Sequence, residues 1–287
     1  MKLGVISDSF RRPMKESIEI AASIGLSGIQ MYAVGDEICP DSLLGDKEKL
    51  NRYKKILRDN FMTVSALCGD LGGHGFERAD DNVWKIEKTK RIVDLACEFE
   101  TNVVTTHIGV IPDNEKEEQY RIMLDGIGEC GIYAASRGVT LAIETGPEIA
   151  PVLYGFVKKT SGGVGVNLDP ANFVMVTGQD PAEAVYLLRD YIVHTHLKDG
   201  KRLKVVEPKI IYGSFAEGGI DGLNAADYFI ETPIGEGDVN FAEYFRALSD
   251  IGYNGYLTIE REAGNDPAAD IKKAADYVRN NFSHILN

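Results

Sequence analysis

Eight short strand-like runs that alternate with helical patterns constrain the fold more than any other feature of these 287 residues. Most of the runs are rich in valine and isoleucine and apolar on both faces, which is typical of parallel strands covered by helices. The predicted strands are residues 2–7, 28–32, 63–68, 102–109, 140–145, 164–169, 191–199 and 255–261. The predicted helices are residues 13–25, 47–60, 83–100, 115–137, 181–190, 241–252 and 267–282. Eight such units in more than about 250 residues predict an α/β fold of the (β/α)8 TIM barrel type.

The chain reads as a single domain over residues 1–287, because no Gly/Ser/Pro linker or low-complexity run divides it. The alternative is a doubly wound open sheet with a second domain. The even rhythm is broken at residues 200–238, which contain the run YGSFAEGGIDG. This segment is too long for a plain connection, so we expect an extended loop after the seventh strand that shapes or covers the active site.

Composition narrows the classes of partner. With 31 basic and 44 acidic side chains the formal charge is −13, whereas a nucleic-acid-binding protein presents a clustered basic face. The four cysteines show no C-x-x-C spacing and the N-terminus does not resemble a signal peptide, so we expect reduced thiols and a cytoplasmic location. No apolar run approaches the roughly 20 residues needed to span a bilayer, so we expect no membrane partner.

Ionisable side chains stand at the ends of the last four predicted strands. In a TIM barrel these ends lie on the face that carries the active site, and neighbouring strands bring them together. Three carboxylates and one imidazole suit one divalent ion such as Mn²⁺, Mg²⁺, Co²⁺ or Zn²⁺, and the absence of cysteine argues against a structural zinc. Any one of these residues alone would more simply be a cap or a loop contact. The four are Glu144, Asp169, His196 and Glu260.

Two further residues share the face of the seventh strand with His196. His194 is two residues earlier, so both imidazoles can point into the barrel. We assign His196 as the ligand because it is nearer the C-terminal end, and expect His194 to pack lower and orient a carboxylate, although the reverse assignment stays open. We also count His194 among the candidate substrate contacts. Lys198 either meets a substrate oxygen or is a solvated lysine on the long loop.

The sequences and the spacing of five segments resemble those of one superfamily over essentially the whole chain. The segments are IET, NLDPAN, HTHLKDGKR, PIGEGDVNF and GYLTIERE, and the chain is similar to the xylose-isomerase-like sugar (phosphate) isomerase/epimerase superfamily. In the ketohexose 3-epimerases of that superfamily, Glu, Asp, His and Glu at the ends of the fifth to eighth strands hold one ion. The resemblance implies the same role for Glu144, Asp169, His196 and Glu260.

The resemblance also suggests residues that meet the substrate. An arginine six residues after the ligand histidine contacts substrate in the epimerases, and Arg202 stands at that spacing. The epimerases carry a second histidine three residues after the aspartate, where this chain has Asn172. This departure bears on the identity of the substrate more than on the metal site. The ETG and LDPAN motifs are closer to those of uncharacterised isomerase-like members than to those of the epimerases themselves.

Endonuclease IV belongs to the same superfamily and holds three zinc ions with additional His and Asp ligands. His107 fits one of these ligands, but Asn172 and Glu231 stand where histidines are expected, and the paired Asp is missing. Together with the acidic net charge, this disfavours a DNA-repair function and leaves His107 as a substrate contact or a packed histidine. His74 and Trp84 either line a sugar site or are a loop histidine and a helix-packing tryptophan.

The chemistry implied by the resemblance is proton abstraction next to the carbonyl of a small carbohydrate substrate, by an isomerase or epimerase. The ion would act as a Lewis acid that stabilises a cis-enediolate, with Glu144 and Glu260 on opposite sides of the substrate as the acid and base. A dehydratase or lyase on a keto-sugar could use the same site. A metal-dependent sugar-binding barrel without turnover is the non-enzymatic alternative, but the presence of both glutamates disfavours it. A homo-oligomer stays possible.

Overall fold

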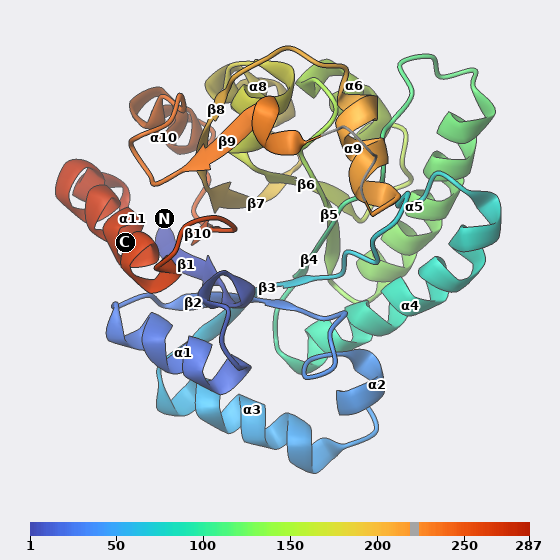
Figure 1. Ribbon diagram of the computed structural model, residues 1–287. Helices are drawn as coiled ribbons and strands as arrows, with labels where there is room; N and C mark the ends of the chain where they lie inside the picture. The colour runs from blue at the N-terminus through green and yellow to red at the C-terminus, as the bar shows by residue number, and fades with distance from the viewer. Residues whose placement is uncertain (219–223) are drawn as a thin grey trace.

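The computed structural model describes residues 1–218 and 224–287, in which eight parallel strands close into a barrel surrounded by helices (Figure 1). The barrel strands are β1 Lys2–Ile6, β2 Gly28–Tyr32, β3 Thr63–Cys68, β4 Val103–Thr106, β5 Thr140–Glu144, β6 Val164–Leu168, β7 Ile192–Leu197 and β10 Tyr256–Ile259. Their order around the barrel is β1-β10-β7-β6-β5-β4-β3-β2. The predicted (β/α)8 fold is confirmed, and the open-sheet alternative is wrong.

The helices form the outer layer and follow the predicted order. Several begin at an Asp or Asn whose side chain accepts a hydrogen bond from a backbone N–H of the first turn, as at Asp46, Asn240 and Asp266. The helices are α1 Met14–Ser23, α2 Pro40–Leu43, α3 Lys47–Asp59, α4 Ala79–Glu98, α5 Glu118–Ser136, α6 Ala150–Val157, α7 Pro170–Asn172, α8 Pro181–Leu188, α9 Pro208–Ala216, α10 Phe241–Asp250 and α11 Pro267–Phe282. Short helical turns are η1 Ser7–Phe10, η2 Phe173–Thr177, η3 Ala225–Asp227 and η4 Ser283–Ile285.

Helix α6 is not among the predicted helices. Its sequence, APVLYGFV, contains a proline and a glycine and lacks the polar face that marks an amphipathic helix. Four of its residues are buried, so packing against the barrel outweighs the weak local preference.

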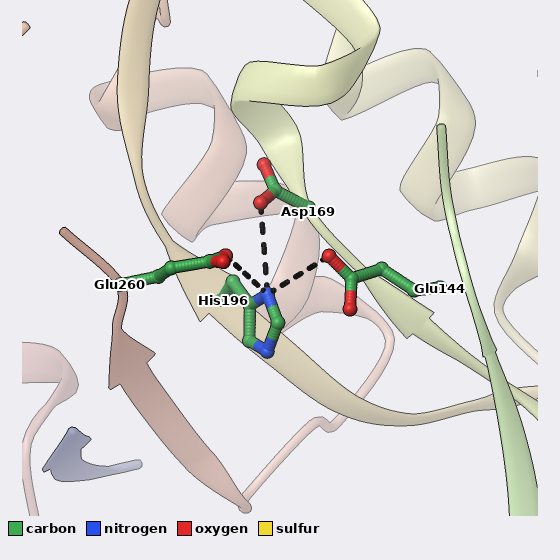
Figure 2. Close-up of side chains that lie close together, drawn as sticks. All are labelled: Glu144, Asp169, His196 and Glu260. Carbon is green, nitrogen blue, oxygen red and sulfur yellow. Dashed lines mark ion pairs between the residues drawn. The ribbon is translucent and has the colours of Figure 1, made fainter. Parts of the chain in front are cut away.

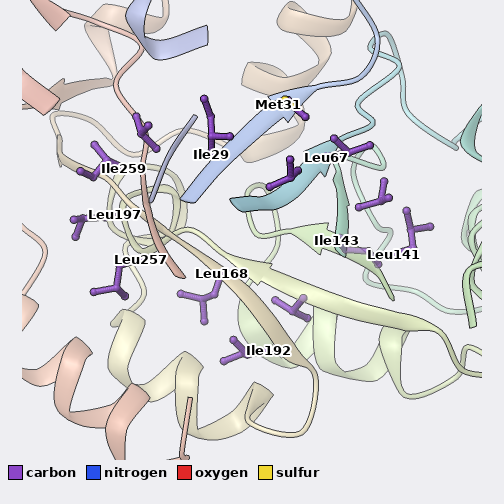
Figure 3. Packing of buried hydrophobic residues seen from close by; sticks show 14 of the residues in the cluster. Ile29, Met31, Leu67, Leu141, Ile143, Leu168, Ile192, Leu197, Leu257 and Ile259 are labelled. Atoms are coloured by element: carbon purple, nitrogen blue, oxygen red, sulfur yellow. The ribbon is translucent and has the colours of Figure 1, made fainter. Parts of the chain in front are cut away.

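The apolar core lies between the barrel strands and the helices that cover them. Figure 3 shows side chains such as Ile143, Leu168 and Leu257 projecting from the strands into this layer. The inside of the barrel differs, because Gln30, Asn167 and His194 are buried there. Gln30 hydrogen-bonds Thr105 and His194 across the barrel, and Asn167 donates to Glu144. Strand alternation therefore separates an apolar outer face from a polar interior, and this polar interior forms the floor of the site.

The segment after β7 is an ordered insertion rather than a plain loop. The predicted strand 191–199 ends at Leu197, and the chain continues as β8 Asp199–Arg202, which pairs antiparallel with β9 Phe229–Thr232 outside the barrel. In the sequence, helix α9 lies between these two strands. Residues 219–222 of the predicted YGSFAEGGIDG run lie outside the described residues.

Asp199 fastens this insertion to the barrel. It is 1% exposed, and its carboxylate accepts hydrogen bonds from the backbone N–H groups of Gly235, Gly237 and Val239. A carboxylate with several N–H donors makes strong, charge-assisted bonds, so the turn that leads into α10 is fixed relative to the end of β7.

Across the described ranges, no helix is long and apolar enough to cross a membrane.

The packing of α5 against the start of β6 gives a test of the fold. Gly163 and Gly138 both have positive φ angles, of +71° and +70°. Alanine at either position should lower the free energy of unfolding by about 1–2 kcal/mol through backbone strain. A Cβ at Gly163 would also overlap the carbonyl oxygen of Gly131, whereas a Cβ at Gly138 meets no heavy atom within 4 Å.

We therefore expect Gly163→Ala to cost about 1–3 kcal/mol more than Gly138→Ala, measured by urea unfolding. Equal losses would show that the close approach of α5 to this strand does not exist in solution.

Candidate metal centre

Four side chains from the ends of adjacent barrel strands meet at one point (Figure 2). Glu144 is the last residue of β5, Asp169 follows β6, His196 lies in β7 and Glu260 follows β10. Because β5, β6, β7 and β10 are consecutive around the barrel, their carboxyl ends converge. One ligand atom from each residue lies within 4.8 Å of the others, and each residue is at most 7% exposed.

One ligand-type atom of each of these four residues faces the same centre. His196 Nδ1 lies 2.9 Å from Glu260 Oε2, 3.4 Å from Glu144 Oε1 and 3.6 Å from Asp169 Oδ2. Asp169 Oδ2, Glu260 Oε2 and His196 Nδ1 are buried and have no hydrogen-bond partner. Three buried carboxylates are costly without a cation, and this donor set fits a divalent ion.

Local structure fixes Asp169 in place. Its Oδ1 accepts hydrogen bonds from the backbone N–H groups of Ala171 (2.7 Å) and Asn172 (3.0 Å), which caps the short helix α7. Its backbone N–H also donates to Thr145 Oγ1 at 2.8 Å. With one carboxylate oxygen held by the cap, Oδ2 is left directed at the centre.

A polar network inside the barrel supports the other ligands from below. Asn167 Nδ2 donates to Glu144 Oε2 at 3.2 Å, and Gln30 Oε1 lies 3.2 Å from His196 Nε2. His194 packs beneath His196, as expected, but its Nε2 contacts Gln30 Oε1 (2.9 Å) and Thr258 Oγ1 (3.0 Å) rather than a carboxylate. Burial, with a smaller effect of the neighbouring His196, lowers the pKa of His194 to about 3, so this ring is neutral.

The predicted substrate contact of His194 is therefore wrong. The ring is 2% exposed and lies on the barrel side of the ligands, where a substrate cannot reach it.

A cavity of about 620 Å³ opens above the four ligands, within the usual range for small-molecule sites. Glu144 and Glu260 line it, together with side chains from several βα loops and from α9. The residues that bear most on its chemistry are Tyr32, Asp70, His107, Lys198, Tyr212 and Glu262.

Lys198 is a buried member of the cavity wall, not a solvated loop lysine. Its Nζ lies 2.5 Å from Glu262 Oε2 and 3.4 Å from Glu260 Oε1. Burial disfavours the charged ammonium, but these two carboxylates outweigh it and raise the pKa of Lys198 well above its usual range. The residue therefore presents a positive charge beside Glu260.

His107 follows β4 and also faces the cavity. Its Nδ1 lies 3.2 Å from Asp70 Oδ2, and its Nε2 lies 3.6 Å from Glu144 Oε1. Desolvation opposes the charged ring, but the carboxylates of Glu144 and Asp70 prevail and raise the pKa of His107 to about 10. The ring is placed to donate hydrogen bonds both to its partner aspartate and toward the cavity.

The structure separates the two other predicted substrate contacts. Asn172 lines the cavity, and its Nδ2 donates to the Thr145 carbonyl. Arg202 instead donates from Nη1 to the carbonyl of Thr177 and does not line the cavity. The reason is that β8 leaves the barrel wall and carries Arg202 against the end of η2, so we correct its assignment.

The endonuclease IV arrangement does not form. Glu231, which stands where a histidine ligand is expected, accepts hydrogen bonds from Arg261 and from the backbone of Glu262. Within the described residues, the four-residue group is the one cluster of metal-ligand type, and His107 is not part of it.

The two aromatic candidates for sugar contact divide in the same way. His74 lines the cavity, and its Nε2 lies 2.5 Å from Glu217 Oε1. This contact joins the loop of residues 69–75, which is rich in glycine, to the end of α9. Trp84 lies on α4, is 49% exposed and does not line the cavity.

A family model described as a xylose isomerase-like TIM barrel matches residues 18–281. The chain belongs to this family. The resemblance expected from the sequence is confirmed.

Curated relatives match part of this chain. An inosose dehydratase of Clostridium perfringens is 28% identical over 160 residues, which are 53% of this chain and 50% of the relative. The chain thus spans about half the length of the curated relatives it matches.

Two solved structures match its fold throughout. The IOLI protein with a bound zinc atom has a TM-score of 0.75 at 16% identity and is covered completely by the match, as is this chain. A D-tagatose 3-epimerase-like protein has a TM-score of 0.72 at 19% identity, over 99% of this chain and 98% of that one.

The double function of Asp169 allows a sharp test of the centre. Asp169→Asn keeps the oxygen that caps α7 but replaces the ligand oxygen by an amide NH₂, which cannot bind a cation. We expect Mn²⁺ affinity, measured by isothermal titration calorimetry, to fall by about 100-fold or more. The melting temperature of the metal-free variant should stay close to that of the wild type, because the oxygen that caps α7 is kept.

The matched control is Asp180→Asn at the cap of α8, where Asp180 accepts from the backbone of Ala182. Its Mn²⁺ affinity should equal that of the wild type. Unchanged affinity in Asp169→Asn would remove Asp169 from the ligand set.

Proposed function

We propose that the protein is a divalent-metal-dependent enzyme that removes a proton from the carbon next to the carbonyl of a polyhydroxy ketone. The observation that carries this proposal is the placement of two buried carboxylates, Glu144 and Glu260, on opposite sides of His196 and open to one cavity (Figure 2). The main candidate reaction is isomerisation or epimerisation of a sugar.

The ion would be held by Glu144, Asp169, His196 and Glu260, and when bound it would supply a Lewis acid for the substrate carbonyl. Glu144 is oriented by Asn167, and Glu260 by the nearby Lys198. One carboxylate removes the proton, and the other returns one. Return to the opposite face of the same carbon inverts it, whereas return to the neighbouring carbon moves the carbonyl.

Dehydration is the second candidate. It is supported by the similarity to inosose dehydratases, which covers about half of the chain. Its first step is the same proton removal. The outcome differs afterwards, because the hydroxyl group on the adjacent carbon leaves with a proton instead of the first carbon being reprotonated. Product analysis therefore separates the two reactions while testing one common step.

The common step is tested by solvent deuterium. The metal-loaded protein should incorporate deuterium from D₂O next to the carbonyl of a keto-sugar or keto-cyclitol in a ¹H NMR screen. With a substrate so identified, Glu260→Gln and Glu144→Gln should each lower turnover by about 100-fold or more, the usual loss for a general acid or base.

The double variant should lose less than the product of the two single losses, because the two groups act as a unit. Glu262→Gln, in the same cavity but outside the ligand set, is the control and should lose less than either. Wild-type turnover in Glu260→Gln would show that the chemistry is elsewhere.

A further inference from the structure

Gln30 lies at the centre of the polar network beneath the ligands. It belongs to β2, on the far side of the barrel from β6 and β7, and is 1% exposed. Its Nε2 donates to Thr105 Oγ1 at 3.1 Å. Its Oε1 lies 2.9 Å from His194 Nε2 and 3.2 Å from His196 Nε2, so one amide oxygen serves two imidazoles.

We propose that Gln30 is a positioning residue that sets the metal affinity of this protein by fixing the tautomer of His196. In this arrangement His196 Nε2–H donates to Gln30 Oε1, and the lone pair of Nδ1 is directed at the three carboxylates. The inference rests on the proposed metal centre and deepens it, because it identifies what makes the imidazole a ligand.

The chemistry of a neutral imidazole requires such a partner. One ring nitrogen carries a proton and the other a lone pair, and only the lone pair can bind a cation. His196 Nδ1 is the nitrogen that faces Glu144, Asp169 and Glu260 (Figure 2), so when a cation binds Nδ1 the ring proton must be on Nε2. A buried N–H needs an acceptor, and ligand histidines almost always have one.

Two amides lie within reach of His196 Nε2, and they favour opposite tautomers. Gln30 presents an oxygen at 3.2 Å, whereas Asn167 presents its Nδ2, a donor, at 3.1 Å. If Asn167 donated to Nε2, the proton would be on Nδ1, where it would block the ion. Gln30 therefore favours the tautomer that can bind metal.

The orientation of both amides follows from their other contacts. Turning the Asn167 amide would place its oxygen against Glu144 Oε2, where its Nδ2 now donates at 3.2 Å. The turn would also leave Nδ2 in the position where Oδ1 is now unpartnered. Turning the Gln30 amide would remove the acceptor from both imidazoles. A carbonyl oxygen has two lone pairs, so Gln30 Oε1 can accept from both rings.

The experiment compares three variants in the otherwise intact protein. Gln30→Met keeps the length and nearly the volume of the side chain but removes the acceptor. Gln30→Glu restores an acceptor oxygen, to which Thr105 can donate its hydroxyl proton. Thr258→Val is the matched control, because Thr258 contacts His194 in the same layer but not His196.

The first readout is Zn²⁺ affinity, measured by competition with a chromogenic chelator. We expect Gln30→Met to bind Zn²⁺ about 10–100-fold more weakly than the wild type, the usual effect of losing a partner of a ligand histidine. Gln30→Glu should recover most of this loss, and Thr258→Val should match the wild type. Unchanged affinity in Gln30→Met, or a loss in Gln30→Glu as large as in Gln30→Met, would overturn the proposal.

The second readout is the imidazole itself and needs no variant. In the Zn²⁺-loaded wild type, ¹⁵N NMR should show His196 coordinated through Nδ1, with an Nε2 proton protected from solvent exchange. Coordination through Nε2, or an unprotected proton, would overturn the role of Gln30 while leaving the metal centre intact. A wild-type protein that binds no Zn²⁺ would instead refute the centre and this inference together.

Discussion

The structure depends most on the confinement of three buried carboxylates around one imidazole nitrogen. Asp169 Oδ2, Glu260 Oε2 and His196 Nδ1 have no hydrogen-bond partner, although each is enclosed by protein. In a medium of low dielectric constant such groups raise the free energy of the folded state unless a cation lies among them. A cation bound among these atoms would remove that cost, and several polar contacts inside the barrel hold the atoms in place.

The fold provides the rigidity that this arrangement needs. The ligands come from four consecutive parallel strands, so their backbone positions are fixed by the same ladder of hydrogen bonds. Each side chain then has its own support: a helix cap for Asp169, Asn167 for Glu144, Gln30 for His196 and Lys198 for Glu260. The insertion that carries β8, β9 and α9 closes one side of the cavity and is itself fastened by Asp199. The geometry of the four side chains thus depends on contacts with residues from strands on several sides of the barrel.

The sequence predicted the barrel and the meeting of the four strand ends, because both follow from local patterns. Alternating strands and helices determine the fold class, and a TIM barrel places strand ends on one face. Gln30 and Asn167 were missed, although a polar residue within an apolar strand was a signal for each. Their partners lie on other strands and become neighbours only when the barrel closes. Arg202 was placed in the substrate site from its distance along the chain, but β8 turns out of the barrel wall and directs the side chain to Thr177.

The position of the ion tests the central claim most directly. Crystals of the protein soaked in Mn²⁺ should give one anomalous difference peak per chain, at about 2.0–2.6 Å from oxygens of Glu144, Asp169 and Glu260 and from His196 Nδ1. Such a peak would establish that the unpartnered atoms are ligands. The account would be contradicted if these side chains enclosed no peak, or if two or three peaks appeared with His107 as a ligand, as in a multinuclear nuclease site.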